Sequence, residues 1–114
     1  MKIFDPLIMF RGWFVGNFEP TAFKTKDFEV GLLEHKAGEH WASHYHKIST
    51  EINYLLEGTM ILQGQTLVAP TIFILEPTEI ADPIFKTDCK LVVIKTPSIP
   101  GDKYITGDNN GIRS

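Results

Sequence analysis

The sequence contains a single cysteine, Cys89, among its 114 residues. One thiol excludes an intrachain disulfide, which fits a reducing compartment. No stretch approaches the roughly 20 consecutive apolar residues that a membrane-spanning helix needs. The first residues, MKIFDPLIMFRGWF, lack the apolar run and small-residue cleavage site of a signal peptide. We therefore expect a cytoplasmic protein that does not contact a membrane.

Basic residues are not in excess either. Eleven Lys and Arg stand against fourteen Asp and Glu, for a net charge of -3. Because a nucleic-acid interface needs a basic patch, this balance argues against a nucleic-acid partner. A chain of 114 residues is long enough for one domain with a core and too short for two. Its eight Phe, three Tyr and two Trp are typical of a β-rich fold.

A sustained helical period is also missing. From residue 27 onward, short apolar runs rich in β-forming residues alternate with turn residues. The runs cover residues 28–34, 41–46, 52–56, 59–62, 66–68, 72–75, 80–85 and 91–95. Many short strands in one small domain predict an all-β fold, either a closed barrel or a double-sheet sandwich.

Two flanking segments differ from this pattern. Residues 1–23 are apolar but interrupted by Pro and Gly, and we expect an N-terminal arm. An exposed aromatic arm would be an unfavourable surface patch, so we expect it to be covered, either by a second subunit in a homodimer or by its own domain. Residues 24–98 form the predicted barrel. Residues 99–114 form an irregular tail in which Tyr104 and Ile105 dock on the barrel, and Asp108 to Ser114 are expected to be loose.

A pair of histidines and a glutamate form the main candidate site. His44 and His46 are two residues apart, so in a strand both imidazoles lie on the same face. Residues 47–50 are polar enough for a turn, after which Glu51 would open the next strand and face the imidazoles. Two neutral nitrogen donors and a carboxylate are the ligand set of a catalytic-type divalent metal site.

The same stretch resembles the first motif of the cupin superfamily. That motif is a glycine, five residues, His-x-His, a glutamate after three or four residues, and a closing glycine. The sequence supplies Gly38, His44, His46, Glu51 and Gly58 at those intervals. The resemblance implies a small single-domain antiparallel jelly-roll β-barrel, with a divalent metal held inside it by His44, His46 and Glu51.

The second cupin motif is degraded. Pro70 and Thr71 stand where Gly-Asp is expected, Pro77 matches, Glu79 replaces a glycine, and Asp82 stands where the motif has its last histidine. The resemblance thus implies that Asp82 takes the place of the third imidazole, either as a fourth ligand or as a general base. The competing interpretation is a turn former, since aspartate before proline commonly has that role. Without Asp82, two histidines and one carboxylate remain, with open positions on the metal.

Other residues near the motif have simpler interpretations. Asn53 shares the Glu51 side of its strand and is a candidate for a polar ligand contact, whereas Tyr54 should face away. His40 is expected at the rim of the pocket, and His35 at the surface. Cys89 is expected to be buried and inert.

Two functions of different classes follow from the resemblance. The first is a metal-dependent cupin that acts on a small polar molecule, with carbohydrate-related isomerase, decarboxylase or oxygenase chemistry. Mixed nitrogen and oxygen ligands suit Fe(II), Mn(II), Ni(II) or Zn(II). The alternative is a non-catalytic module that binds or senses a sugar-like small molecule. A metal with an exchangeable position facing an open pocket would distinguish the enzyme from the binding module.

Overall fold

Alternating side chains along the strands direct one face of each sheet inward. The computed structural model describes residues 1–106. In this part of the chain there are eleven strands, one short 3-10 helix and no α-helix. The elements are η1 (Pro6–Ile8), β1 (Trp13–Gly16), β2 (Phe23–Lys24), β3 (Glu29–His35), β4 (His44–Tyr45), β5 (Thr50–Glu57), β6 (Thr59–Leu62), β7 (Gln65–Val68), β8 (Thr71–Leu75), β9 (Ile84–Phe85), β10 (Cys89–Thr96) and β11 (Tyr104–Ile105).

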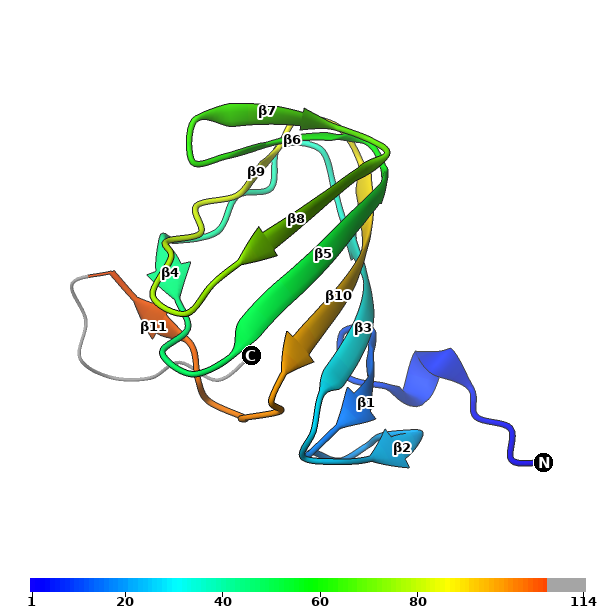
Figure 1. The fold of residues 1–114 in the computed structure, drawn as a ribbon. Coiled ribbons are helices and arrows are strands. Elements are labelled where there is room, and N and C mark those ends of the chain that lie inside the picture. The colour runs from blue at the N-terminus through cyan, green and yellow to red at the C-terminus, as the bar shows by residue number, and fades with distance from the viewer. Residues whose placement is uncertain (107–114) are drawn as a thin grey trace.

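The strands form one large sheet and two small ones. The large sheet has six strands in the order β2-β1-β3-β10-β5-β8, and the small sheets are β7-β6-β9 and β11-β4. In Figure 1 the small sheets lie to one side of the large sheet, so the fold has two layers. All strand pairs are antiparallel except β1 with β2. The all-β prediction is therefore confirmed. The strands of residues 1–106 form separate sheets that face each other, and their hydrogen bonds do not continue around a closed barrel.

The hydrophobic core lies between these layers. Along β10, burial alternates strictly from Cys89 to Lys95. Leu55 of β5 is completely buried, and Leu91 and Val93 of β10 are each 3% exposed. The small sheets contribute Met60 and Leu62 from β6 and Phe85 from β9. Together these side chains close one end of the space between the layers with apolar surface.

The strand register also places a row of charges at the other end of the same inner face. Lys95 of β10 lies opposite Glu29 of β3 on one side and opposite Glu51 of β5 on the other. We call Glu29, Lys95 and Glu51 the charged row. Two residues further along, Val93 lies opposite Asn53, which is also buried. Along the strands, the inner face of the large sheet is therefore polar at the end with Lys95 and apolar at the end with Leu91.

Gly58 closes the turn between β5 and β6, where the first motif requires a glycine. Its φ is +98°, a left-handed conformation that favours glycine. A Cβ atom at this position would lie 2.3 Å from the carbonyl oxygen of Asp88. Both the backbone conformation and the close approach of the neighbouring chain therefore explain this glycine.

Part of the expected N-terminal arm belongs to the large sheet. β1 pairs with β3, and Val15 of β1 lies opposite Val30. The difference arises because a few alternating residues at 13–16 suffice to extend an existing sheet edge, a signal hidden by the flanking glycines. Residues 1–8 stay exposed, with Ile3 82% and Leu7 91% exposed. Homodimerisation through this apolar segment stays a prediction.

The C-terminal segment docks on the small sheet, as predicted. Tyr104 and Ile105 form β11 and pair with Tyr45 and His44 of β4. The expectation that Asp108 to Ser114 are loose lies outside the described residues. None of the helical structure in residues 1–106 has the length and apolar character needed to cross a membrane.

Candidate functional site

A cavity of about 900 Å³ lies between the large sheet and the small sheets. Most of its wall is apolar, with Trp13, Trp41, Met60, Phe73, Leu75 and Phe85 among the lining residues. Its polar wall is made by His44, His46, Glu51, Asn53, Lys95 and Lys103. An apolar cavity with a few convergent polar groups is the usual form of a small-molecule site.

Strand β4 and the residue that directly follows it bring two imidazoles, those of His44 and His46, to the cavity. His44 and His46 are 8% and 5% exposed, and their ring centroids are 5.9 Å apart. The backbone of His44 exchanges two hydrogen bonds with Ala81, of 2.9 and 2.7 Å, which fixes the strand. His44 Nδ1 lies 2.9 Å from the carbonyl oxygen of Ala42 and donates to it. Nε2 of His44 is therefore the unprotonated nitrogen, the form that binds a metal.

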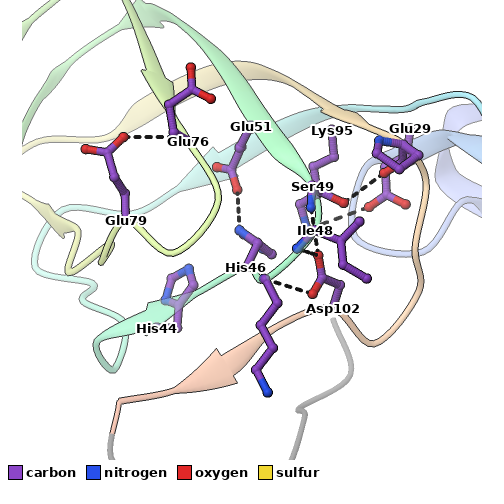
Figure 2. A network of polar contacts seen from close by, with 12 residues as sticks. Glu29, His44, His46, Ile48, Ser49, Glu51, Glu76, Glu79, Lys95 and Asp102 are labelled. Atoms are coloured by element: carbon purple, nitrogen blue, oxygen red, sulfur yellow. Dashed lines mark hydrogen bonds and ion pairs between the residues drawn. The ribbon is translucent and has the colours of Figure 1, made fainter.

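His46 faces Glu51 across the turn. Its Nδ1 lies 3.5 Å from Glu51 Oε2 (Figure 2), whereas its Nε2 is buried and has no hydrogen-bond partner among residues 1–106. In the same described part of the chain, Asn53 Nδ2 is buried and unpartnered as well. Because buried polar atoms are nearly always paired, two orphaned atoms in one cavity wall indicate that a ligand completes it.

Both imidazoles are neutral near pH 7. Burial lowers the pKa of His44; its hydrogen bond to Ala42 opposes this effect and the positive charge of Lys103 adds to it. Burial, followed by the charge of Lys95, lowers the pKa of His46 to about 4. Neutral imidazole is the form that serves as a metal ligand or as a hydrogen-bond acceptor.

One buried carboxylate fixes the turn between His46 and Glu51. Asp102 accepts hydrogen bonds from the backbone N–H groups of Lys47, Ile48 and Ser49, at 3.0, 3.0 and 2.9 Å (Figure 2). Burial alone would raise the pKa of Asp102, but these three donors outweigh it, and the pKa is lowered. The C-terminal segment thus holds the histidines in place, a role that no local motif in the sequence indicates.

Asp82 does not join the other predicted ligands. Its carboxylate accepts a 2.8 Å hydrogen bond from the backbone N–H of Gln63, and it is not among the residues that line the cavity. Ala81, which is 4% exposed, is the residue bridged to His44. Because neighbouring residues in extended chain point to opposite sides, Ala81 faces inward and Asp82 faces the β6–β7 hairpin. Asp82 itself lies in extended chain and its carboxylate binds the β6–β7 turn through Gln63, so the structure does not bring it to His44, His46 and Glu51.

Three of the other residues near the motif lie where the sequence predicted, and His35 does not. Asn53 lines the cavity and Tyr54, 42% exposed, faces away, as predicted. Cys89 is buried, and burial raises the pKa of its thiol, as expected for an inert cysteine. The surface position expected for His35 is wrong. Its ring stacks on Phe85, with centroids 4.1 Å apart, and it contributes to the cavity wall.

Two lysines were missed entirely. Lys95 and Lys103 are each 8% exposed, and both line the cavity. The alternation Leu91, Val93, Lys95 in one strand places Lys95 on the buried face, so the sequence carried a signal for it. Lys103 follows a proline- and glycine-rich connection, where no periodicity indicates which way a side chain points.

The donors suit a divalent metal chemically, although they are not gathered into a complete site. Within residues 1–106, no three His, Cys, Asp or Glu side chains are arranged as a metal-binding group. The 3.5 Å between His46 Nδ1 and Glu51 Oε2 nevertheless matches two ligands of one tetrahedral ion, about 3.4 Å apart for bonds of about 2.1 Å. Free Nε2 of His44 is the third donor available at this wall.

No protein-family model matches the sequence. No curated protein sequence matches it either.

Solved structures of cupin type resemble the fold. A conserved protein with a double-stranded β-helix domain from Klebsiella pneumoniae has a TM-score of 0.64 and 20% identity, over 71% of each chain. An RmlC-like cupin from Shewanella frigidimarina has a TM-score of 0.59 and 18% identity, over 65% of this chain and 69% of the other. DMSP lyase DddQ from Ruegeria pomeroyi has a TM-score of 0.67 and 14% identity, over 83% of this chain and 50% of the other. The chain therefore has the cupin fold that its first motif predicted.

Proposed function

We propose that the protein binds a small polar molecule in the cavity between its sheets, at a divalent metal ion held by His44, His46 and Glu51. The observation that carries this proposal is the 3.5 Å between His46 Nδ1 and Glu51 Oε2, in a wall that also presents the second neutral imidazole, His44. Within residues 1–106, Nε2 of His46 is buried without a hydrogen-bond partner, which is costly, and a hydrogen-bonding group of the bound molecule would satisfy it.

The charges and donors of this wall support the proposal. When bound, a divalent ion would supply a Lewis acid able to polarise a carbonyl or carboxylate oxygen. Asn53 offers an amide donor to orient the molecule, and the aromatic lining provides apolar surface for the rest of it. Fold alone does not establish an activity, but a DMSP lyase among the proteins of this fold supports small-molecule chemistry in such a cavity.

Elemental analysis of the purified full chain tests the metal. We expect about one equivalent of Mn, Fe, Ni or Zn after supplementation in the unmodified protein, and a loss of most of it in His44→Ala and His46→Ala. His40→Ala is the matched control, because His40 is an exposed histidine of the same segment that does not line the cavity. Equal metal content in all four proteins, or none in the unmodified one, would contradict the metal proposal.

A binding module without metal is the second candidate. The observation that favours it is the absence of a complete three-ligand group within residues 1–106, together with two lysines in the same wall. Positive charges repel a cation and attract an anionic ligand. Ligand binding that persists in metal-free protein and in His44→Ala would favour this candidate.

A further inference from the structure

Lys103 is a buried cation without an ion-pair partner in residues 1–106. Its side chain lines the cavity and is 8% exposed. Within residues 1–106, no carboxylate oxygen lies within 4.0 Å of its ammonium nitrogen. Buried charges in proteins are normally paired, because the desolvation of a lone ammonium is unfavourable. An unpaired lysine in a cavity wall therefore indicates that its partner is a ligand.

A second cation shares the same aromatic ring. Lys103 Nζ lies 4.2 Å from the ring centroid of Trp41, and the Arg11 guanidinium carbon lies 5.3 Å from it. Arg11 also lines the cavity and, like Lys103, has no ion pair in the described part of the chain. The charge of Arg11, which is itself exposed, acts unfavourably on Lys103, and an anion bound near both would relieve this repulsion.

The carboxylate that contacts the Trp41 ring, Glu39, is already engaged elsewhere. Glu39 accepts a 2.8 Å hydrogen bond from Trp41 Nε1 and also contacts His35 Nδ1. These contacts fix the indole ring, and they leave the cation pair on it without a carboxylate of its own. The other charges that act on Lys103 are Lys95 and Glu51 of the charged row.

We propose that Lys103 and Arg11, placed on the Trp41 ring, form an anion-recognition site in the cavity wall, and that the ligand joins a carboxylate or phosphate group to an apolar body. The apolar body follows from the lining by Met60, Phe73 and Phe85. The inference rests on the proposed function in one respect, since both place a small molecule in the same cavity.

Binding of three probes to the full chain tests the inference. Calorimetry at pH 7 compares phenylacetate, phenyl phosphate and the neutral phenylacetamide. We expect the better anion to bind at least about tenfold more tightly than the amide, because a charged hydrogen bond typically contributes that much. The ratio between phenylacetate and phenyl phosphate then distinguishes a carboxylate ligand from a phosphate ligand. Equal affinities for both anions and the amide would overturn the inference.

Variants assign the preference to the two cations. Lys103→Met should reduce the preference for anions to within about twofold, and Arg11→Met should weaken it by a smaller factor. Lys47→Met is the matched control: Lys47 Nζ lies 4.3 Å from the Tyr104 ring, but the residue is exposed and does not line the cavity. Lys103→Gln replaces Lys103→Met if the latter does not fold. An unchanged preference in both Lys103 variants would overturn the inference.

The metal content of the same variants separates the two proposals. Lys103→Met should keep the metal of the unmodified protein while losing the preference for anions. Loss of the anion preference with normal metal content supports the anion site. An unchanged anion preference with normal metal content overturns the anion site and leaves the proposed function intact.

Discussion

Lys95 and Lys103 differ in one respect that decides what each does. Both are 8% exposed and line one cavity, and their Nζ atoms lie 4.8 and 4.2 Å from the rings of Trp13 and Trp41. Lys95 has a partner, Glu29, at 3.6 Å, and Lys103 has none within residues 1–106. The two lysines are therefore equally buried, but only Lys95 has an ion-pair partner in this part of the chain. A paired buried cation belongs to the structure, whereas an unpaired one facing a cavity is available to a ligand.

The two lysines also have different supports. Lys95 belongs to β10, the strand between β3 and β5, and the register places it between two glutamates. Ser98 Oγ donates a 2.8 Å hydrogen bond to Glu29, which completes that pairing. Lys103 directly follows Asp102, whose carboxylate binds the turn before Glu51. Lys103 is therefore positioned by the Asp102 anchor on one side and by the two-stranded β11-β4 sheet on the other, not by the large sheet.

The largest effect is expected from Lys95→Met. Removing one partner of a buried ion pair leaves Glu29, 6% exposed, without its cation. We expect the free energy of unfolding to fall by about 3–5 kcal/mol, as measured by urea denaturation. Lys95→Met combined with Glu29→Gln should recover part of the loss. A loss below about 1 kcal/mol would show that the pair is unimportant to the fold.

Lys103→Met should have the opposite sign. Burial, together with the charges of Lys95 and Arg11, lowers the pKa of Lys103 to about 8, against the attraction of Glu51. The charged form therefore destabilises the folded state at pH 7. Its replacement by an apolar side chain of similar length should raise the free energy of unfolding by about 1–3 kcal/mol, in the same urea experiment.

The pH dependence gives the control for this prediction. A lysine whose pKa is lowered by folding destabilises the protein fully below about pH 8, where both states carry the proton. Between pH 8 and its ordinary pKa of about 10.4, the folded state has released the proton and the unfolded state has not. The stability of the unmodified protein should therefore approach that of Lys103→Met as pH rises through this window. A constant difference from pH 7 to pH 10 would contradict the assignment.

Asp102→Asn should have an intermediate effect. Asp102 is 5% exposed and accepts three backbone hydrogen bonds, so a neutral amide in its place weakens the anchor. We expect a loss of about 1–3 kcal/mol of unfolding free energy and a weaker affinity for anionic probes, because Lys103 shares the segment. Loss of stability with unchanged affinity would show that Lys103 is positioned independently of Asp102.

The smallest effect is expected from Lys47→Met. This lysine also lies over an aromatic ring, at 4.3 Å from Tyr104, but it is exposed. Surface substitutions of this kind change stability by no more than about 0.5 kcal/mol, and no change in anion affinity is expected. A larger change in stability or in anion affinity would mean that contact with an aromatic ring is enough to produce the effects expected for Lys103, whether or not the lysine is buried and unpaired.

The sequence predicted what depends on short spacings and missed what depends on distant contacts. The short spacings between Gly38, His44, His46, Glu51 and Gly58 carry the resemblance to cupins, which implied the fold. The i, i+2 spacing of the histidines and the turn before Glu51 predicted that these three side chains share one wall.

Asp82 was misplaced because an interval of fixed length does not specify which side of the chain faces inward, and Ala81 takes that side. Asp102 and Lys103 reach the site from more than fifty residues away along the chain. The hydrogen bonds of Asp102 to the turn and the docking of β11 on β4 determine their positions.

An NMR titration of the Lys103 side-chain ammonium shows whether this buried charge is available to an anionic ligand. We expect a pKa of about 8 in the free protein, because the charge is buried and has no ion-pair partner within residues 1–106, and a clear rise when phenylacetate binds beside it. An ordinary lysine pKa of about 10.4, insensitive to phenylacetate, would contradict both the missing partner and the anion site.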